Sequence, residues 1–204
     1  MYKFSYYTEE DDQKVIDFMK QNAFALITGA GEKYPVATQI PLEIKTKEGK
    51  IFLEGHLMRK TDHHLAFEKN NNVLVLFTGP HCFVSASWYT NPGIGSTWNY
   101  LTVHAKGTIT FADEEGTYKA VKTVSDKYEG TSSAGAFDNL PQEYIDHMMK
   151  AIVGFSIEVE SIDNVFKLSQ NRDEASQRNI IEQLKKRGDC NAMAIAKEME
   201  HRLS

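Results

Sequence analysis

Runs of apolar, β-branched and aromatic residues dominate most of this chain, and few helical segments separate them. Short runs of this composition, bounded by Gly, Pro, Asn and Asp, favour β-strands. They lie at 24–29, 34–57, 72–79, 82–89, 98–111 and 154–161. The second run contains two strands joined by a turn at 47–50. Six or more strands with so few helices between them indicate an antiparallel barrel with helical decoration, a mainly β (α+β) fold class.

Three of these runs make finer predictions. Pro41 lies inside the first strand of the second run, and because proline cannot donate a ladder hydrogen bond, it indicates an edge or a bulge. The run NVLVLFTG is apolar without alternation, so we expect it to be buried on both faces. The run GFSIEVES alternates apolar and polar residues, which predicts a half-buried strand.

Helical segments are expected at both ends of the chain and between the strands. Thr8 followed three residues later by Asp11 resembles a capping box and predicts a helix from Thr8 to Gln21. Thr61 is the expected N-cap of a second, short helix. The other expected helices cover 113–128, a segment that starts at Pro141, and two closing segments separated by Gly188.

The composition is that of a soluble globular protein, with 41% hydrophobic and 25% charged residues. The N-terminus lacks the pattern of a signal peptide, and apolar segments fall short of the roughly 18 residues that span a membrane. Cys82 and Cys190 predict two reduced thiols in a cytoplasmic protein. A net charge of −5 gives no general attraction to nucleic acid. We expect one domain over residues 1–170 and a helical tail over 171–204 packed on it.

The sequence HLMRKTDHH could bind an anion. Arg59 and Lys60 come directly before Thr61, the expected helix N-cap. A helix N-terminus offers unpaired N–H groups and the positive end of a dipole, and two cations beside it suit a phosphate. The alternative is an ordinary capped helix preceded by two solvated cations.

Two further clusters could contact a ligand. In STWNYLTVHAKGTIT, strand alternation places Trp98 and Tyr100 on one face, where they could stack on a planar ring, and Asn99 on the other. Packing at a barrel end or a subunit interface is the alternative. The hexapeptide KLSQNR is dense in donors and suits an anion or the polar edge of a ring, although a plain polar loop also explains it.

Six segments resemble, in the same order, a known family. They are ATQIPL, GHLMRK, GPHCFVSASWY, STWNYLTVHAKG, IVGFSIEVE and KLSQNR. The resemblance is to the PaiB-like FMN-binding negative transcriptional regulators. It implies an FMN-binding split β-barrel over residues 1–170, related to pyridoxamine phosphate oxidase, and a homodimer with FMN at the subunit interface.

The resemblance also implies cofactor-binding residues. His56, Arg59, Lys60 and Thr61 would bind the FMN phosphate and ribityl chain, and Gln39 would approach the flavin. Thr97, Trp98 and Asn99 would lie near the flavin from the interface, and Gln170 and Arg172 would belong to a covering C-terminal arm. Family members often have GHLAR and then NP, whereas this chain has GHLMRKTDHH, which adds the cation Lys60.

The resemblance leaves regulation and catalysis as alternatives. The closing helices superficially resemble a helix-turn-helix, but Glu198 and Glu200 in the second helix would face DNA phosphates. Direct DNA binding is therefore supported by the family alone. A flavin-dependent oxidoreductase acting on a small molecule is the other hypothesis, with His56, His104 and Tyr100 as candidate proton donors.

A metal site is the least favoured alternative. The adjacent His63 and His64 would point about 100° apart on a helix, and carboxylates at metal-ligand spacing are absent. We therefore expect no metal.

Overall fold

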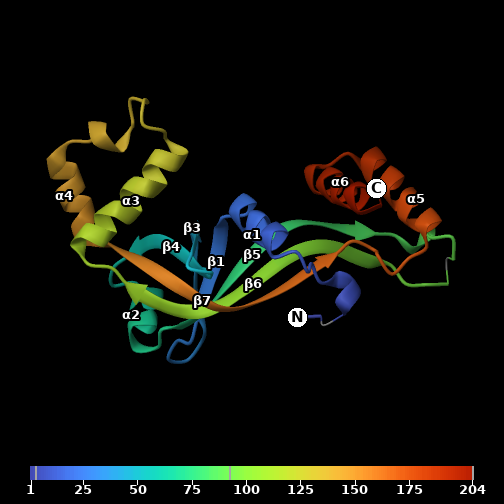
Figure 1. Ribbon diagram of the computed structural model, residues 1–204, viewed down its shortest axis with the longest axis horizontal. Coiled ribbons are helices and arrows are strands. Elements are labelled where there is room, and N and C mark those ends of the chain that lie inside the picture. Colours follow the sequence, from blue (N-terminus) through green and yellow to red (C-terminus); the bar gives the residue numbers. More distant parts are fainter. Residues whose placement is uncertain (3, 92, 204) are drawn as a thin grey trace. The chain divides into compact units, whose positions relative to one another are not determined.

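The computed structural model describes residues 1–2, 4–91 and 93–203. Within them, seven strands form one sheet in the order β2-β1-β5-β6-β7-β4-β3 (Figure 1). The strands are β1 Phe24–Gly29, β2 Val36–Pro41, β3 Glu43–Lys47, β4 Lys50–Met58, β5 Asn72–Val84, β6 Thr97–Phe111 and β7 Ile152–Lys167. The α-helices are α1 Asp12–Gln21, α2 Asp62–Lys69, α3 Glu114–Tyr128, α4 Gln142–Ala151, α5 Glu174–Arg187 and α6 Cys190–Leu203. Along these residues, no helix combines the length and apolarity that a membrane crossing requires.

The chain divides into two compact units. Unit 1 comprises residues 1–18, 78–103 and 163–204, and unit 2 comprises 19–77 and 104–162. The long strands β5, β6 and β7 each contribute one part to each unit. The closing helices α5 and α6 belong to unit 1. The boundary that we predicted after residue 170 stays a prediction.

Each unit has a core of its own. In unit 1, buried side chains from the strands and from the two closing helices include Val84, Leu101, Ile180, Leu184 and Ile195. In unit 2, those from the strands include Ile27, Leu53, Val75, Phe77 and Ile157. A smaller cluster in unit 2 joins α3, α4 and the start of β7 through Val121, Phe137, Ile145 and Ile152.

The strand predictions are partly confirmed. Glu48 and Gly49 have φ values of 53° and 78°, which makes the predicted turn between β3 and β4. Pro41 ends β2, an edge strand of the sheet, and Leu42 separates it from β3, so this segment contains three strands rather than two.

Two predictions about β5 are wrong. A separate strand at 82–89 was expected, but β5 runs continuously to Val84 and a 3-10 turn follows at Ala86–Trp88. The NVLVLFTG run is also not buried on both faces. Its side chains alternate, with Val73, Val75 and Phe77 buried and the intervening leucines partly exposed.

The helix starts follow their capping side chains. The predicted start at Thr8 is wrong, because Asp11 accepts hydrogen bonds from the backbone of Gln13 and Lys14 and α1 begins at Asp12. Thr61 caps α2, as predicted, and Asp113 caps α3, which begins one residue after the predicted start at 113. Gly188 ends α5 with φ 73°, a left-handed conformation that glycine adopts at no steric cost.

Candidate functional site

The junction between β4 and α2 is built around Lys60 and Thr61. Lys60 has φ 63°, in the left-handed region that non-glycine residues rarely adopt. This conformation turns the chain out of β4 and into the helix. The Thr61 hydroxyl accepts a hydrogen bond from His64 N at 3.4 Å and donates one to the Met58 carbonyl at 3.0 Å. The Lys60 side chain is exposed, directly before a capped helix N-terminus.

Arg59 contacts the α4–β7 junction, and its predicted contact with FMN stays a prediction. Its backbone N–H donates to Ala151 O and its Nε to Ile152 O, both at 2.8 Å. The side chain lines a hollow of about 680 Å³ in unit 2. The other lining residues come from α3 and α4: Glu114, Thr117, Tyr118, Asp146, Met149 and Lys150. Arg59 therefore fastens the α4–β7 junction, and Lys60 is the cation beside the α2 N-terminus.

His56 lies on β4, opposite Gly154 of β7. Its buried Nδ1 has no hydrogen-bond partner among the described residues. Burial lowers the pKa of His56 from its ordinary value, so the imidazole is neutral at neutral pH. A buried ring nitrogen without a partner costs free energy unless a ligand satisfies it.

Asp62 sets the electrostatics of the same helix start. Its carboxylate accepts a hydrogen bond from His63 N at 2.8 Å and lies 3.1 Å from His63 Nδ1. The backbone hydrogen bond from His63 is the main cause of the lowered pKa of Asp62, and the His63 side chain adds to it. An ionised carboxylate in the first turn suits the helix dipole but opposes a bound phosphate.

Gln39 stands on the edge strand β2 with an exposed side chain, opposite Leu26 of β1. Helix α2 packs close to β1 because Gly29 has no side chain. A Cβ at Gly29 would lie 2.8 Å from the Phe67 ring. Gln39, His56, Arg59, Lys60 and Thr61 thus all belong to unit 2.

The other five predicted residues belong to unit 1. Thr97 accepts a hydrogen bond from Lys167 Nζ at 2.6 Å. Trp98 is 54% exposed, with its ring 6.1 Å from Phe83 and 6.2 Å from His81. This exposed aromatic patch on β5 and β6 consists of His81, Phe83 and Trp98.

Asn99 and Gln170 use their amide groups inside unit 1. Asn99 is fully buried, accepts from the Ser169 hydroxyl at 3.0 Å and lies 3.5 Å from the Met199 sulfur. Gln170 accepts from Leu168 N and donates to Phe166 O. Both amides hold the KLSQNR loop in place. Their predicted contacts with the flavin stay a prediction.

Arg172 stacks its guanidinium on the Tyr89 ring, with Cζ 4.7 Å from the centroid. The sequence did not single out Tyr89 as a site residue, although Tyr89 ends the segment GPHCFVSASWY that carries part of the family resemblance. A lone tyrosine in a strand-like run gives no signal of its own. Only the fold shows that it meets Arg172.

The described residues contain no group of three His, Cys, Asp or Glu side chains placed to hold a metal ion. His63 contacts Asp62 and Thr61, whereas the buried His64 ring packs 4.9 Å from Phe111.

The fold is a split β-barrel, with helices added at its C-terminus. The lysine and the capped helix start after β4, together with the unsatisfied His56, fit a phosphate-bearing cofactor. The family model described as "Putative FMN-binding domain" matches residues 1–161, and the chain belongs to this family. FMN is accordingly its cofactor.

Two curated relatives are similar in sequence. The protease synthase and sporulation protein PAI 2 of Bacillus subtilis is 32% identical over 204 residues, which is 100% of this chain and 98% of the relative. An uncharacterized protein of Aspergillus fumigatus is 31% identical over 157 residues, 66% of this chain and 60% of its own length.

Two solved structures share the fold at low identity. The flavocytochrome Anf3 of Azotobacter vinelandii has a TM-score of 0.60 at 12% identity, covering 82% of this chain and 72% of that one. The FAD and heme binding protein of Mycobacterium smegmatis has a TM-score of 0.59 at 13% identity, covering 79% and 73%.

Proposed function

We propose that this protein is a homodimeric, FMN-binding regulator of the PaiB type, in which Lys60, Thr61 and the first turn of α2 receive the FMN phosphate. The supporting observation is the β4–α2 junction, where a lysine in the left-handed region precedes a capped helix N-terminus. The positive end of the α2 dipole and the Lys60 ammonium together suit a dianionic phosphate, whereas the N–H groups of His63 and His64 already donate to Asp62 and Thr61. The His56 Nδ1 offers a further polar contact to the same cofactor. Bound FMN supplies electron and hydride transfer.

Titration of the cofactor-free protein with FMN tests the phosphate assignment. Lys60→Ala removes one charge–phosphate contact and should weaken FMN binding roughly tenfold, with little change in riboflavin binding, because riboflavin lacks the phosphate. Lys69→Ala is the matched control, since Lys69 is an exposed lysine at the opposite end of α2. Equal FMN affinity in the two variants would contradict the assignment.

The exposed aromatic patch supports the homodimer. Large apolar side chains gathered on a surface often mark protein interfaces, where aromatic residues are enriched. Trp98→Glu should therefore convert a dimer into a monomer in sedimentation experiments. The same substitution at Tyr128, a 61% exposed aromatic on α3, is the control and should leave the dimer intact. A wild-type chain that sediments as a monomer would refute the dimer.

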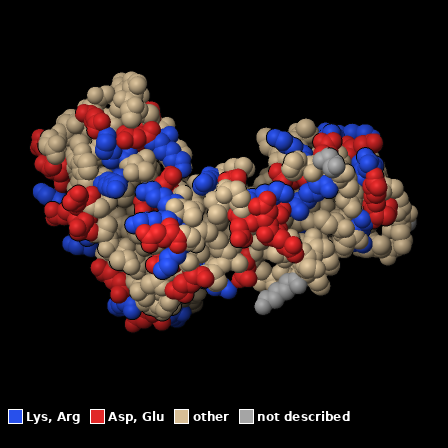
Figure 2. All heavy atoms as spheres, viewed as in Figure 1, with Lys and Arg blue, Asp and Glu red and all other residues tan. Residues whose placement is uncertain are grey.

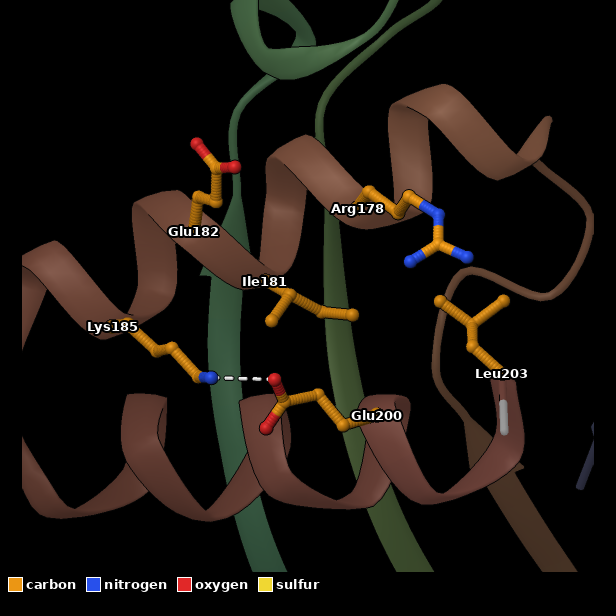
Figure 3. Close-up of a pocket in the computed structure, with 6 residues that line it drawn as sticks. All are labelled: Arg178, Ile181, Glu182, Lys185, Glu200 and Leu203. Carbon is orange, nitrogen blue, oxygen red and sulfur yellow. Dashed lines mark hydrogen bonds and ion pairs between the residues drawn. The ribbon is translucent and has the colours of Figure 1, made fainter.

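The regulatory role is proposed because the full-length B. subtilis relative is named for protease synthesis and sporulation. Direct DNA contact through α5 and α6 has little electrostatic support. Lys185 pairs with Glu200 across a hollow of about 560 Å³ lined by Ile181 and Leu203 (Figure 3). Arg187 pairs with Asp189. Lys and Arg are interspersed with Asp and Glu over the face drawn in Figure 2.

A flavin-dependent oxidoreductase is the alternative. The paired cations of α5 and α6 favour it indirectly, because they weaken the case for a DNA-binding regulator. Burial raises the pKa of Tyr100, so its hydroxyl keeps its proton at neutral pH. The neutral His56 can hold one proton on its ring. Anaerobic mixing of the FMN-loaded protein with NADH or NADPH distinguishes the two functions. Rapid bleaching of the flavin absorbance supports an oxidoreductase, and an unreduced flavin supports a regulator that senses or stores FMN.

A further inference from the structure

A pair of cations lies beside three tyrosines in unit 1, away from the β4–α2 junction in sequence. Lys167 Nζ lies 5.6 Å from the Tyr2 ring and 5.7 Å from the Tyr7 ring. Arg172 stacks on Tyr89 at 4.7 Å. Lys167 and Arg172 stand at the two ends of the short segment KLSQNR, and Arg172 acts electrostatically on both Lys167 and Tyr7.

Neither cation forms an ion pair with a carboxylate within the part of the chain that the structure describes. The adjacent Asp173 is used otherwise, since it accepts from the Thr90 hydroxyl at 2.9 Å and from the Ser176 hydroxyl at 2.7 Å. Burial is the main cause of the lowered pKa of Lys167, and Arg172 adds to it. Two partly buried cations that repel each other without a counter-charge are unfavourable in an isolated protein.

Two buried polar atoms of the same cluster are unsatisfied. The Tyr89 hydroxyl and Arg172 Nε have no hydrogen-bond partner among the described residues. Tyr89 is only 6% exposed, so water does not compensate its hydroxyl freely. Unpartnered buried donors are rare in folded proteins and call for an explanation, such as a missing ligand.

The loop between the two cations is held rigidly. Ser169 has φ 62°, a strained conformation for a residue with a side chain. Its hydroxyl donates to Asn99 and its carbonyl accepts from Arg172 N at 3.0 Å. Gln177 Nε2 donates to Arg172 O at 2.7 Å. These bonds fix the backbone that carries Lys167 and Arg172, so the cations are positioned before any ligand arrives.

We propose that Lys167, Arg172 and Tyr89 form a binding site for the oxyanion of a small molecule, a carboxylate or a phosphate group separate from that of FMN. The ligand would accept hydrogen bonds from Arg172 Nε and the Tyr89 hydroxyl, and its charge would offset the cation pair. Both cations keep some exposure, so an ion approaches their side chains from solvent, and the buried Arg172 Nε and Tyr89 hydroxyl become accessible as the ligand enters. This inference does not depend on the FMN phosphate assignment.

Calorimetric titration of the FMN-saturated protein tests the site, with inorganic phosphate and acetate as probes and chloride as the control for ionic strength. We expect saturable binding of at least one probe. Arg172→Gln and Tyr89→Phe should weaken it roughly tenfold or more. Arg178→Gln is the control, because Arg178 is an exposed arginine of α5 that pairs with Glu174, and it should leave binding unchanged. Tighter binding of phosphate than of acetate would indicate that the natural ligand carries a phosphate group, and the reverse order would indicate a carboxylate.

Three results would overturn the proposal: no saturable heat with either probe, unchanged binding in both cluster variants, or binding that FMN abolishes. The last would mean that FMN itself occupies the cluster. A thermal-shift measurement separates binding from folding. Tyr89→Phe should be no less stable than the wild type without phosphate, yet lose the stabilisation that phosphate gives. The Lys60 variants report on the FMN phosphate separately, so failure of one assignment leaves the other testable.

Discussion

The Arg59 Nε donates to the carbonyl oxygen of Ile152 at 2.8 Å and so ties the end of β4 to the start of β7. Its backbone N–H extends the same connection to Ala151 O. Adjacent residues thus have different roles, because Arg59 joins two elements of unit 2 while Lys60 remains exposed at the α2 N-terminus.

Arg59→Ala should lower the free energy of unfolding of the cofactor-free protein by about 1–2 kcal/mol, the usual cost of a charge-assisted hydrogen bond. Lys60→Ala should leave this free energy within about 0.5 kcal/mol of the wild type, because the Lys60 side chain is exposed. Urea unfolding of the cofactor-free variants measures both. Equal stability of the two variants would show that the Arg59 contact contributes nothing.

Asp62→Asn should raise the affinity for FMN roughly twofold at low salt, and less as salt is added. The substitution removes a negative charge from the first turn of α2 but keeps an oxygen that accepts from His63 N. FMN titration at two ionic strengths measures the effect. A fall in affinity would mean that the phosphate lies away from this helix start.

His56 makes stability depend on pH. Burial lowers its pKa in the folded state below the ordinary 6.5. The unfolded state therefore binds more protons, and stability falls as pH drops through about 6.5. His56→Gln should remove part of this loss between about pH 7 and pH 5. Chemical unfolding of wild type and variant across this range, without FMN, measures the difference, and parallel pH profiles would count against the assignment.

The two thiols should differ in reactivity. Cys82 is fully buried, and burial raises the pKa of its thiol to about 11, whereas Cys190 is exposed. Because the thiolate is the reactive form, a thiol reagent should label Cys190 quickly and Cys82 only after unfolding. Mass spectrometry of the labelled native protein identifies the site. Rapid labelling of a Cys190→Ser variant would contradict this prediction.

Local rules predicted much of the fold from the sequence. Thr61 and Asp113 are strong caps whose effect depends only on neighbouring backbone, and the glycine turn at Gly49 needs no distant contact. The prediction that the first helix begins at Thr8 was wrong because Asp11 offers a carboxylate oxygen closer to the helix start. The β5 prediction failed because burial of Leu74 depends on what covers the sheet, which no local pattern contains.

The candidate site was predictable as motifs but not as geometry. The sequence places Arg59 and Lys60 side by side, and only the α4–β7 junction shows that Arg59 has a partner there. Likewise, Asn99 suits a ligand by its type, yet Ser169 and Met199, 70 and 100 residues away, hold it in the core. Contacts over such separations are set by the fold.

Helix α3 lies close to Gly154 of β7, and the last prediction concerns this contact. Its N–H donates to the Thr117 hydroxyl at 3.0 Å, and a Cβ there would lie 2.9 Å from Thr117 Cα and 3.3 Å from Ala120 Cβ. Because the nearest atom is helix backbone, Gly154→Ala must push α3 away and should cost about 1–3 kcal/mol. The displaced helix also carries Glu114 and Tyr118, which line the hollow beside Arg59.

Gly95→Ala is the matched control, since a Cβ at Gly95 meets no atom within 4 Å among the residues that the structure describes. It should change stability by no more than about 0.5 kcal/mol. Thermal unfolding of both variants without FMN gives the comparison. Equal melting temperatures would mean that α3 is not held against β7 at Gly154. The α3 residues would then not form one side of the hollow beside Arg59.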